Sequence, residues 1–334
     1  MLTTFLFLLC AAAIYVACEF FVNGVEWVGR KLDLGATATG TVLAAFGTAL
    51  PESAVTFVAV VFGHTAQHRD IGVGAALGGP LVLATIGYTV VGAALWCNRK
   101  HLQRRDSMVH VAHRRLARDQ RWFLGIFVVK CALGLLTFAF KPALGVVFLL
   151  AYAAYVWREI KDDGGVREES VLAPLRLQPR RGVPTWGMVL LQTVLALVVI
   201  AVAARTFVRQ IELIGVALSM SPHLVSLVLS PVATELPEVV NALIWVRQGK
   251  ERLALANISG AMMIQATIPS ALALFGTPWR FDAPLLLAGV MTGLAVVYLW
   301  QLFRNGRVDA RRLLPVSALY MIFIGYVALR VARQ

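Results

Sequence analysis

Two short polar strings interrupt apolar sequence and carry the residues best suited to chemistry. The first is Gly-Thr-Ala-Leu-Pro-Glu at 47–52, and the second is Ala-Thr-Glu-Leu-Pro-Glu at 233–238. A glutamate at membrane depth is costly unless something neutralises or coordinates it, so it indicates a functional site. The proline beside each glutamate cannot donate a backbone hydrogen bond, which predicts a broken helix with free carbonyl oxygens. Such features in two corresponding places are typical of a transporter's ion site.

The residue types in these strings favour a hard cation. Glu235 and Glu238 are three residues apart, and Thr48 and Glu52 are four apart, so each pair shares one helix face. Carboxylates, hydroxyls and freed carbonyls form an all-oxygen set that suits Ca²⁺ in particular. Zinc or copper would call for His or Cys, and neither lies in the strings. One carboxyl group kept protonated for packing is an alternative that explains a single glutamate better than three.

The elements that must hold these strings are long apolar segments. Of the 334 residues, 59% are apolar and 15% are charged, unlike an ordinary soluble domain. Ten apolar runs approach the roughly 20 residues that span a bilayer. The runs are 2–22, 36–62, 71–96, 122–140, 142–157, 186–204, 217–246, 253–274, 283–303 and 313–329. The sequence therefore predicts an all-α polytopic membrane protein with ten transmembrane helices, of which helices 2 and 7 break at a midplane ion site.

The formal net charge of +13 is explained by topology rather than by nucleic-acid binding. If the N-terminus lies outside, the inward loops hold 23 Lys and Arg residues and the outward side holds 7. This bias is the positive-inside signature, and it predicts that both termini lie outside. Lys130 falls within the fourth run. It could counter the acidic residues, although snorkelling or a local partner is the favoured interpretation.

The two polar strings belong to a longer internal repeat. Residues 16–52 align with 202–238 at a constant offset, and Glu26, Thr48, Leu50, Pro51 and Glu52 then meet identical residues. Five spans per half is an odd number, so the second half would insert upside down, as an inverted-topology repeat. We expect a first half at 1–158, a cytoplasmic linker at 159–185 and a second half at 186–334.

Both strings resemble the Gly-Thr-Ser-Leu-Pro-Glu signature of the sodium/calcium exchangers, in the cation/calcium antiporter superfamily. The family's second signature, Gly-Asn-x-x-Gly-Ser-Asn, is approximated by Ala-Asn-Ile-Ser-Gly-Ala-Met at 256–262. The resemblance implies Ca²⁺ held by Glu52 and Glu238, with backbone oxygens at Thr48 and Thr234 as further ligands. It also implies exchange of Ca²⁺ for Na⁺ by alternating access in a bacterial inner (plasma) membrane, with no cofactor.

Several positions depart from the family pattern. The serine after the threonine is Ala49 in one half and Glu235 in the other, and the first-half amide position is Ala75, so only Asn257 keeps an amide. Fewer of the polar side chains that would hold sodium are present, and one carboxylate is gained. A proton-coupled antiporter of Ca²⁺ or another divalent cation, using Glu235, is therefore an alternative.

Two further classes of function remain as rivals. A passive cation channel also uses carboxylates for selection, and counter-flux would distinguish it from an antiporter. A membrane-embedded enzyme would need a nucleophile–base pair or a metal-ligand set at depth, and the sequence offers neither. The expected partners are thus Ca²⁺, a monovalent counter-ion and the lipid bilayer, and no oligomeric state is predicted.

Overall fold

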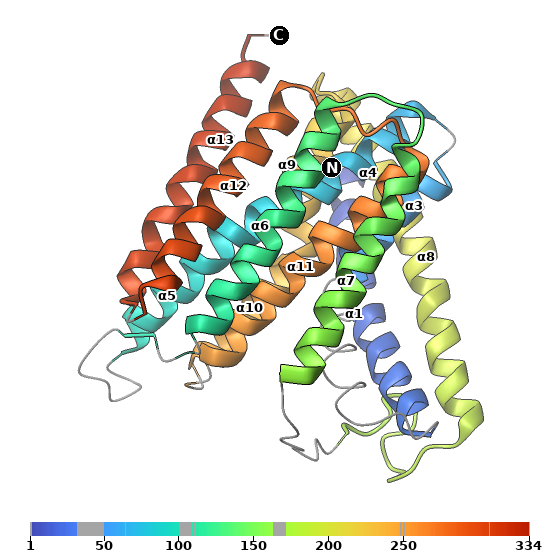
Figure 1. Ribbon diagram of the computed structural model, residues 1–334. Coiled ribbons are helices and arrows are strands. Elements are labelled where there is room, and N and C mark those ends of the chain that lie inside the picture. The colour runs from blue at the N-terminus through green and yellow to red at the C-terminus, as the bar shows by residue number, and fades with distance from the viewer. Residues whose placement is uncertain are drawn as a thin grey trace.

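The computed structural model is a bundle of helices (Figure 1). It describes residues 2–31, 50–63, 65–99, 108–109, 111, 113–162, 172–247, 249, 251–306 and 308–333, and these contain no β-strand. The helices are α1 (Leu2–Lys31), α3 (Leu50–Val61), α4 (Ala66–Val82), η1 (Leu83–Gly87), α5 (Tyr88–Asn98), α6 (His113–Leu135), η2 (Pro142–Leu144), α7 (Gly145–Asp162), α8 (Trp186–Ala217), α9 (Pro222–Thr234), α10 (Leu236–Arg247), α11 (Glu251–Gly276), α12 (Ala283–Arg304), η3 (Ala310–Val316) and α13 (Ser317–Val331).

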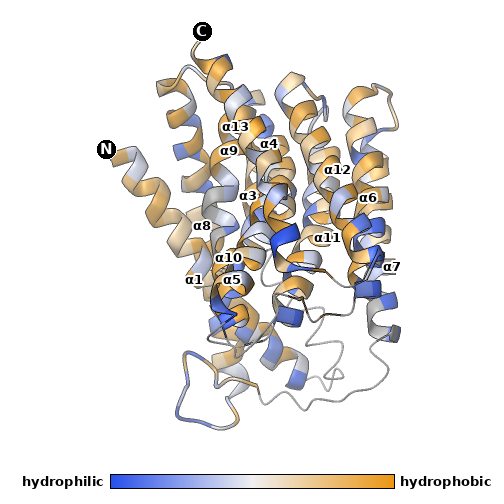
Figure 2. Cartoon of the chain, turned by 90° about the vertical axis from the view of Figure 1, so that its left-hand side faces the viewer, coloured by the Kyte–Doolittle hydropathy of each residue, from blue (hydrophilic) through white to orange (hydrophobic). Residues whose placement is uncertain are grey.

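The helices have the length and surface of a membrane protein. Six helical segments in the described part are long and apolar enough to cross a bilayer. Large apolar side chains point outward along α1, α8 and α13, where lipid chains would cover them. Hydrophilic residues gather toward the lower end of the bundle in Figure 2, and apolar residues dominate elsewhere. The chain is therefore an integral membrane protein.

Each predicted apolar run overlaps a helix in the described residues, although the boundaries differ. The second run is described only from Leu50 onward, and its residues 36–49 lie outside the described part. The fourth run was predicted to end at 140, but α6 ends at Leu135, and the chain then turns toward η2. The C-terminal ends of α1, α5, α7, α10 and α12 lie at one end of the bundle (Figure 1). The described helix ends that precede the predicted basic loops therefore share one end of the bundle, and the side of the membrane on which that end lies stays a prediction.

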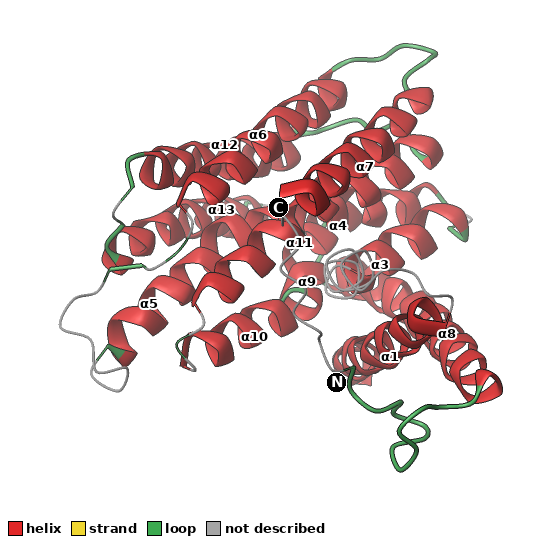
Figure 3. Ribbon diagram, turned by 60° about the horizontal axis from the view of Figure 1, so that its bottom comes forward, coloured by secondary structure: helices red, strands yellow, loops and turns green. Residues whose placement is uncertain are grey.

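α1 and α8 form a two-helix unit beside the rest of the bundle (Figure 3). Phe7 of α1 stacks on Phe207 of α8, with ring centroids 4.7 Å apart. The two helices also pack against α3 and α9. Most other buried apolar residues belong to a separate core that joins α4, α5, α6, α11 and α12. The fold thus presents a thin pair of helices against a thicker body.

α4 and α9 approach each other closely. This contact fixes the position of α9, which is the first part of the broken helix. A Cβ added to Gly78 would lie 2.5 Å from Cγ of Pro231 and 2.6 Å from the carbonyl oxygen of Leu227, both of α9. The hydroxyl of Ser226 donates to the carbonyl of Ile71 at 2.7 Å. Glycine is required at position 78 because a side chain there would push the helices apart.

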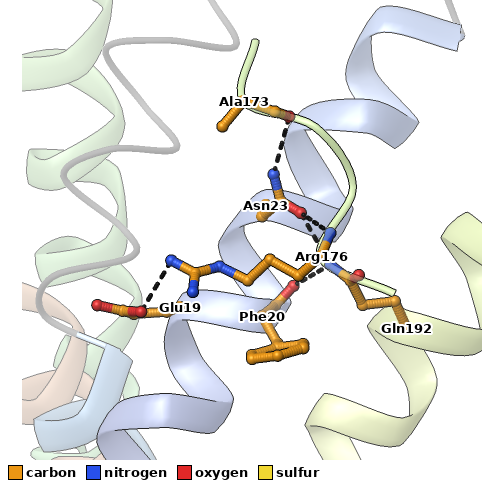
Figure 4. Close-up of polar contacts among 6 residues, drawn as sticks. All are labelled: Glu19, Phe20, Asn23, Ala173, Arg176 and Gln192. Carbon is orange, nitrogen blue, oxygen red and sulfur yellow. Dashed lines mark hydrogen bonds and ion pairs between the residues drawn. The ribbon is translucent and has the colours of Figure 1, made fainter. Parts of the chain in front are cut away.

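The described end of the predicted linker is docked on α1 and α8 (Figure 4). Asn23 donates to the carbonyl of Ala173 at 3.3 Å and accepts from the backbone N–H of Arg176 at 3.1 Å. The same Asn23 oxygen accepts from the Gln192 amide at 3.0 Å. Leu175 is fully buried in a small apolar cluster with Trp27. Residues 172–177 therefore pack on the two-helix unit, whereas 163–171 lie outside the described part.

The α4–α9 contact can be tested with matched glycines. Gly78→Ala should destabilise the protein by about 1–3 kcal/mol because the methyl group overpacks the contact. Gly125→Ala in α6 is the control, since nothing lies within 4 Å of an added Cβ there. It should be neutral or slightly stabilising because alanine favours helix. Thermal unfolding in detergent measures both, and equal effects of the two substitutions would contradict the close approach.

The docking of the linker predicts a change in proteolysis. Asn23→Ala removes three hydrogen bonds, a loss of about 1–3 kcal/mol, and should speed tryptic cleavage after Arg176 by about tenfold or more. Thr185→Ala is the control, because the Thr185 side chain is exposed and makes no helix-capping hydrogen bond. An unchanged cleavage rate in Asn23→Ala would show that these bonds do not hold the segment.

Candidate cation site

The second polar string breaks its helix as the sequence predicts. α9 ends at Thr234, α10 begins at Leu236, and Glu235 lies at the break. Pro237 has no N–H to offer the carbonyl of Ala233, so the helical ladder cannot continue through this point. In the first string the described chain begins at Leu50, and Thr48 lies outside the described residues. A break in the first half therefore stays a prediction.

The glutamate after the proline in each polar string occupies the same position in its described helix. Glu52 and Glu238 are each the third residue of their described helices, α3 and α10, directly after a proline. Both side chains are only 1% exposed. Glu238 lies in the first turn of α10, where a carboxylate faces the positive end of the helix dipole, which partly offsets the cost of burying it.

Glu52 and Glu235 lie in one polar cluster that joins three helices. The hydroxyl of Thr234 donates to Oε2 of Glu52, so α9 is tied to α3. The side-chain amide of Gln265, on α11, donates to Oε1 of Glu235 at 2.6 Å. Glu52 also interacts electrostatically with Glu235 and with Glu238. The structure thus brings together Glu52, Thr234 and Glu235, three of the predicted site residues, and their role as cation ligands stays a prediction.

Gln265 was missed by sequence reasoning. It is fully buried. A signal was available, because Gln265 is a polar residue in an apolar run, a little over two turns after Asn257 on α11. A buried amide in an apolar helix needs a polar partner, and here the partner is Glu235.

Glu238 faces a cavity rather than the closed cluster. The cavity has a volume of about 340 Å³, and Glu238, Asn241 and Asn257 line it together with residues of α1. Ala173 and Arg176 of the docked linker also line it. Arg176 pairs with Glu19 at 2.8 Å (Figure 4). A cation that enters beside the linker would therefore meet Glu238 and the two amides first.

Several buried oxygens of these helices have no hydrogen-bond partner in the described part of the chain. They are Oε1 of Glu52, Oγ1 of Thr56, Oγ of Ser230, Oε2 of Glu235, Oε2 of Glu238 and Oε1 of Gln265. Buried polar atoms are normally paired, so a group of unpaired acceptors needs an explanation. Among the described residues no three Asp, Glu, His or Cys side chains converge closely enough to hold a metal alone. A cation here would also need hydroxyl, amide or backbone oxygens.

Lys130 does not snorkel, so that part of the sequence interpretation is wrong. Its side chain is 0% exposed, because α11 and α12 pack on α6. Its ammonium group finds a local partner instead, and donates to the carbonyl of Ala76 at 2.8 Å. The carbonyl of Lys130 itself accepts from the indole of Trp279 at 3.0 Å.

Comparisons with known proteins cover most of the chain. A putative antiporter CaxA from Alkalimonas amylolytica is 24% identical over 337 residues, which cover 98% of each chain. The uncharacterized membrane protein MJ0091 of Methanocaldococcus jannaschii is 23% identical over 267 residues, or 80% of this chain and 79% of that protein.

Two solved exchangers share the fold. The H⁺/Ca²⁺ exchanger CAX superposes with a TM-score of 0.69 at 16% identity, over 98% of this chain and 82% of that one. The sodium-calcium exchanger NCX_Mj, soaked with Na⁺ and Sr²⁺, gives a TM-score of 0.59 at 20% identity, over 97% and 98%. The model of the sodium/calcium exchanger protein family matches residues 2–161 and 188–332, and these segments hold both glutamate strings. This chain therefore belongs to the sodium/calcium exchanger protein family.

Proposed function

We propose that this protein is a secondary active antiporter that exchanges Ca²⁺ for Na⁺ by alternating access. The observation that carries the proposal is the group of buried, unpaired oxygens around Glu52, Glu235 and Glu238 at a helix break. Carboxylate, hydroxyl and amide oxygens are the ligands that Ca²⁺ takes in flexible geometry. We propose Glu52, Glu238, Thr48, Thr234, Glu235 and Asn257 as the ligand set.

The packing of the helices supports an inverted repeat of two five-helix halves. In the proposed correspondence α1 matches α8, α3 matches α10, and α4 matches α11. Contacts then occur in matching places: α3 packs on α4 as α10 packs on α11, and the corresponding helices α1 and α8, and α4 and α11, pack on each other. Such a pseudo-two-fold axis would relate Glu52 to Glu238, and 159–185 would be the linker between the halves.

The charge of the site explains why transport would be obligatory exchange. A site with several unpaired carboxylates is too costly to seal from water on both sides. Ca²⁺ or monovalent cations cancel that charge, so only loaded forms would change access. We propose that the α1–α8 unit moves against the thicker body, because α1 contributes several cavity-lining residues and Glu238 lies beyond them.

Protons are the second candidate counter-ion, and Glu235 is the observation that favours them. The family signature has serine where this chain has Glu235, and a carboxyl group can carry a proton whereas a serine hydroxyl cannot. The family's first-half amide position, Ala75, lies in a fully buried stretch of α4 that offers no side-chain oxygen to sodium. The rival of another class, a passive channel, would conduct without counter-flux.

The role of the glutamates can be measured as calcium uptake into proteoliposomes. Glu52→Gln or Glu238→Gln should lower exchange by about a hundredfold or more, because each removes a ligand and one of the charges that Ca²⁺ must cancel. Glu212→Gln is the control, since Glu212 is only partly buried and pairs with His68 at 2.8 Å. Exchange retained in both glutamate variants would refute the proposed site.

The counter-ion can be identified with the unmodified protein. Radioactive calcium uptake should be compared under an outward sodium gradient, an outward proton gradient and no gradient. We expect uptake to follow the sodium gradient. Uptake under the proton gradient alone would assign the counter-ion to protons and the carrier role to Glu235. Equal flux under all three conditions would favour the channel.

A further inference from the structure

A proline in α4 leaves a backbone acceptor that Lys130 satisfies. Pro80 has no N–H, so the carbonyl of Ala76, four residues earlier, cannot form its helical hydrogen bond. The ammonium group of Lys130 donates to this carbonyl at 2.8 Å and lies 5.3 Å from the ring centroid of Phe127. A cation is therefore fixed at a freed carbonyl oxygen in the interior of the bundle.

The same stretch of α4 borders the carboxylates. A Cβ added to Gly79 would lie 2.9 Å from Oε1 of Glu235, so Glu235 lies directly against the helix that Lys130 contacts. Lys130 interacts electrostatically with Glu52, which in turn interacts with Glu235. Lys130 is thus part of the electrostatic surroundings of the site.

The formal net charge of the buried cluster is equal and opposite to the charge of a divalent cation. Glu52, Glu235 and Glu238 are each 1% exposed, and Lys130 is 0% exposed. Three carboxylates and one ammonium group leave two formal negative charges, which one divalent or two monovalent cations cancel. Glu19 is paired with Arg176 and leaves this balance unchanged. Without Lys130, a calcium-loaded site would keep an uncompensated buried charge.

We infer that Lys130 is a tethered cation that offsets Glu235, so that the buried site presents the two negative charges that one Ca²⁺ cancels. The inference rests on the proposed function, and it makes Lys130 a positioning residue that sets the charge of the loaded form. It also links the extra carboxylate to a lysine on another helix. A site that is neutral when it holds its ion can change access within the bilayer at low cost. A site with a net charge must bear the free-energy cost of an uncompensated buried charge.

The test is calcium self-exchange, in which radioactive calcium leaves proteoliposomes for unlabelled external calcium. This step needs only the calcium-loaded form to switch, so it does not depend on the counter-ion. Lys130→Met and Glu235→Gln should each slow it by about tenfold or more, because each leaves the loaded site one charge out of balance. The double variant Lys130→Met/Glu235→Gln restores the balance, and it should exchange faster than either single variant.

Two further variants separate charge from structure. Lys130→Gln keeps a donor for the Ala76 carbonyl but has no charge, and it should be as slow as Lys130→Met. Lys141→Met removes a lysine that is 4% exposed and donates to the carbonyls of Leu136, Pro278 and Trp279. It should lower thermal stability and leave the self-exchange rate close to that of the unmodified protein.

The outcomes decide the inference. A double variant as slow as the single variants, or a Lys130→Gln variant as fast as the unmodified protein, would overturn it and leave Lys130 a structural donor. Faster exchange in the double variant, with all variants eluting as folded protein on size-exclusion chromatography, would support it. Absence of self-exchange in the unmodified protein would instead refute the proposed function itself.

Discussion

The constraint on which this structure depends is the burial of three carboxylates in a bundle that lies in lipid. Glu52, Glu235 and Glu238 are almost fully enclosed, and the lipid around the bundle holds no water that could solvate them. A hydroxyl and an amide satisfy only some of their oxygens. In a transporter the remaining charge must be cancelled by a cation that can dissociate, because otherwise the site would stay permanently occupied. Polar groups from α3, α9, α10 and α11 therefore meet here, and the helices around them are correspondingly apolar.

The backbone can break at this depth because neighbouring helices cover the break. The interruption at Glu235 lies where α9 packs on α4, and Gly78 lets Pro231 approach within contact distance. Removing side-chain volume from α4 has a second effect, because it also places Gly79 against the carboxyl group of Glu235. The small residues of α4 thus contribute geometry rather than ligands. Irregular backbone inside a membrane protein is tolerated under this condition, namely that protein and not lipid surrounds it.

Much of the fold could be predicted from the sequence, because each required signal is local. Apolar runs give the spans, and a proline beside a glutamate gives the break at 235. Contacts between distant segments could not be predicted in the same way. Gln265 had a periodic signal but needed Glu235 beside it to have a meaning, and the docking of 172–177 depends on Asn23 and Gln192 from two other helices. Lys130 illustrates the limit most clearly. A lone lysine in an apolar run is usually drawn to the interface, and only the packing of α11 and α12 on α6 shows that it is enclosed.

Among the described residues, the cavity reaches one side of the site and not the other. Glu238 is reached from the cavity, whereas Glu52 and Glu235 lie in the cluster behind it, tied to Thr234 and Gln265. Tyr15, Cys18 and Glu19 of α1 line the same cavity as Glu238. A displacement of α1 and α8 would therefore change the access of water to Glu238 while leaving the contacts between α3, α9 and α11 in place. Residues 172–177 would move with that pair, because they are hydrogen-bonded to α1 through Asn23 and to α8 through Gln192. An ion bound by both Glu238 and Glu52 would neutralise the cavity side and the cluster side of the site at once. In the proposed mechanism, this neutralisation is the condition for the α1–α8 unit to move across the site.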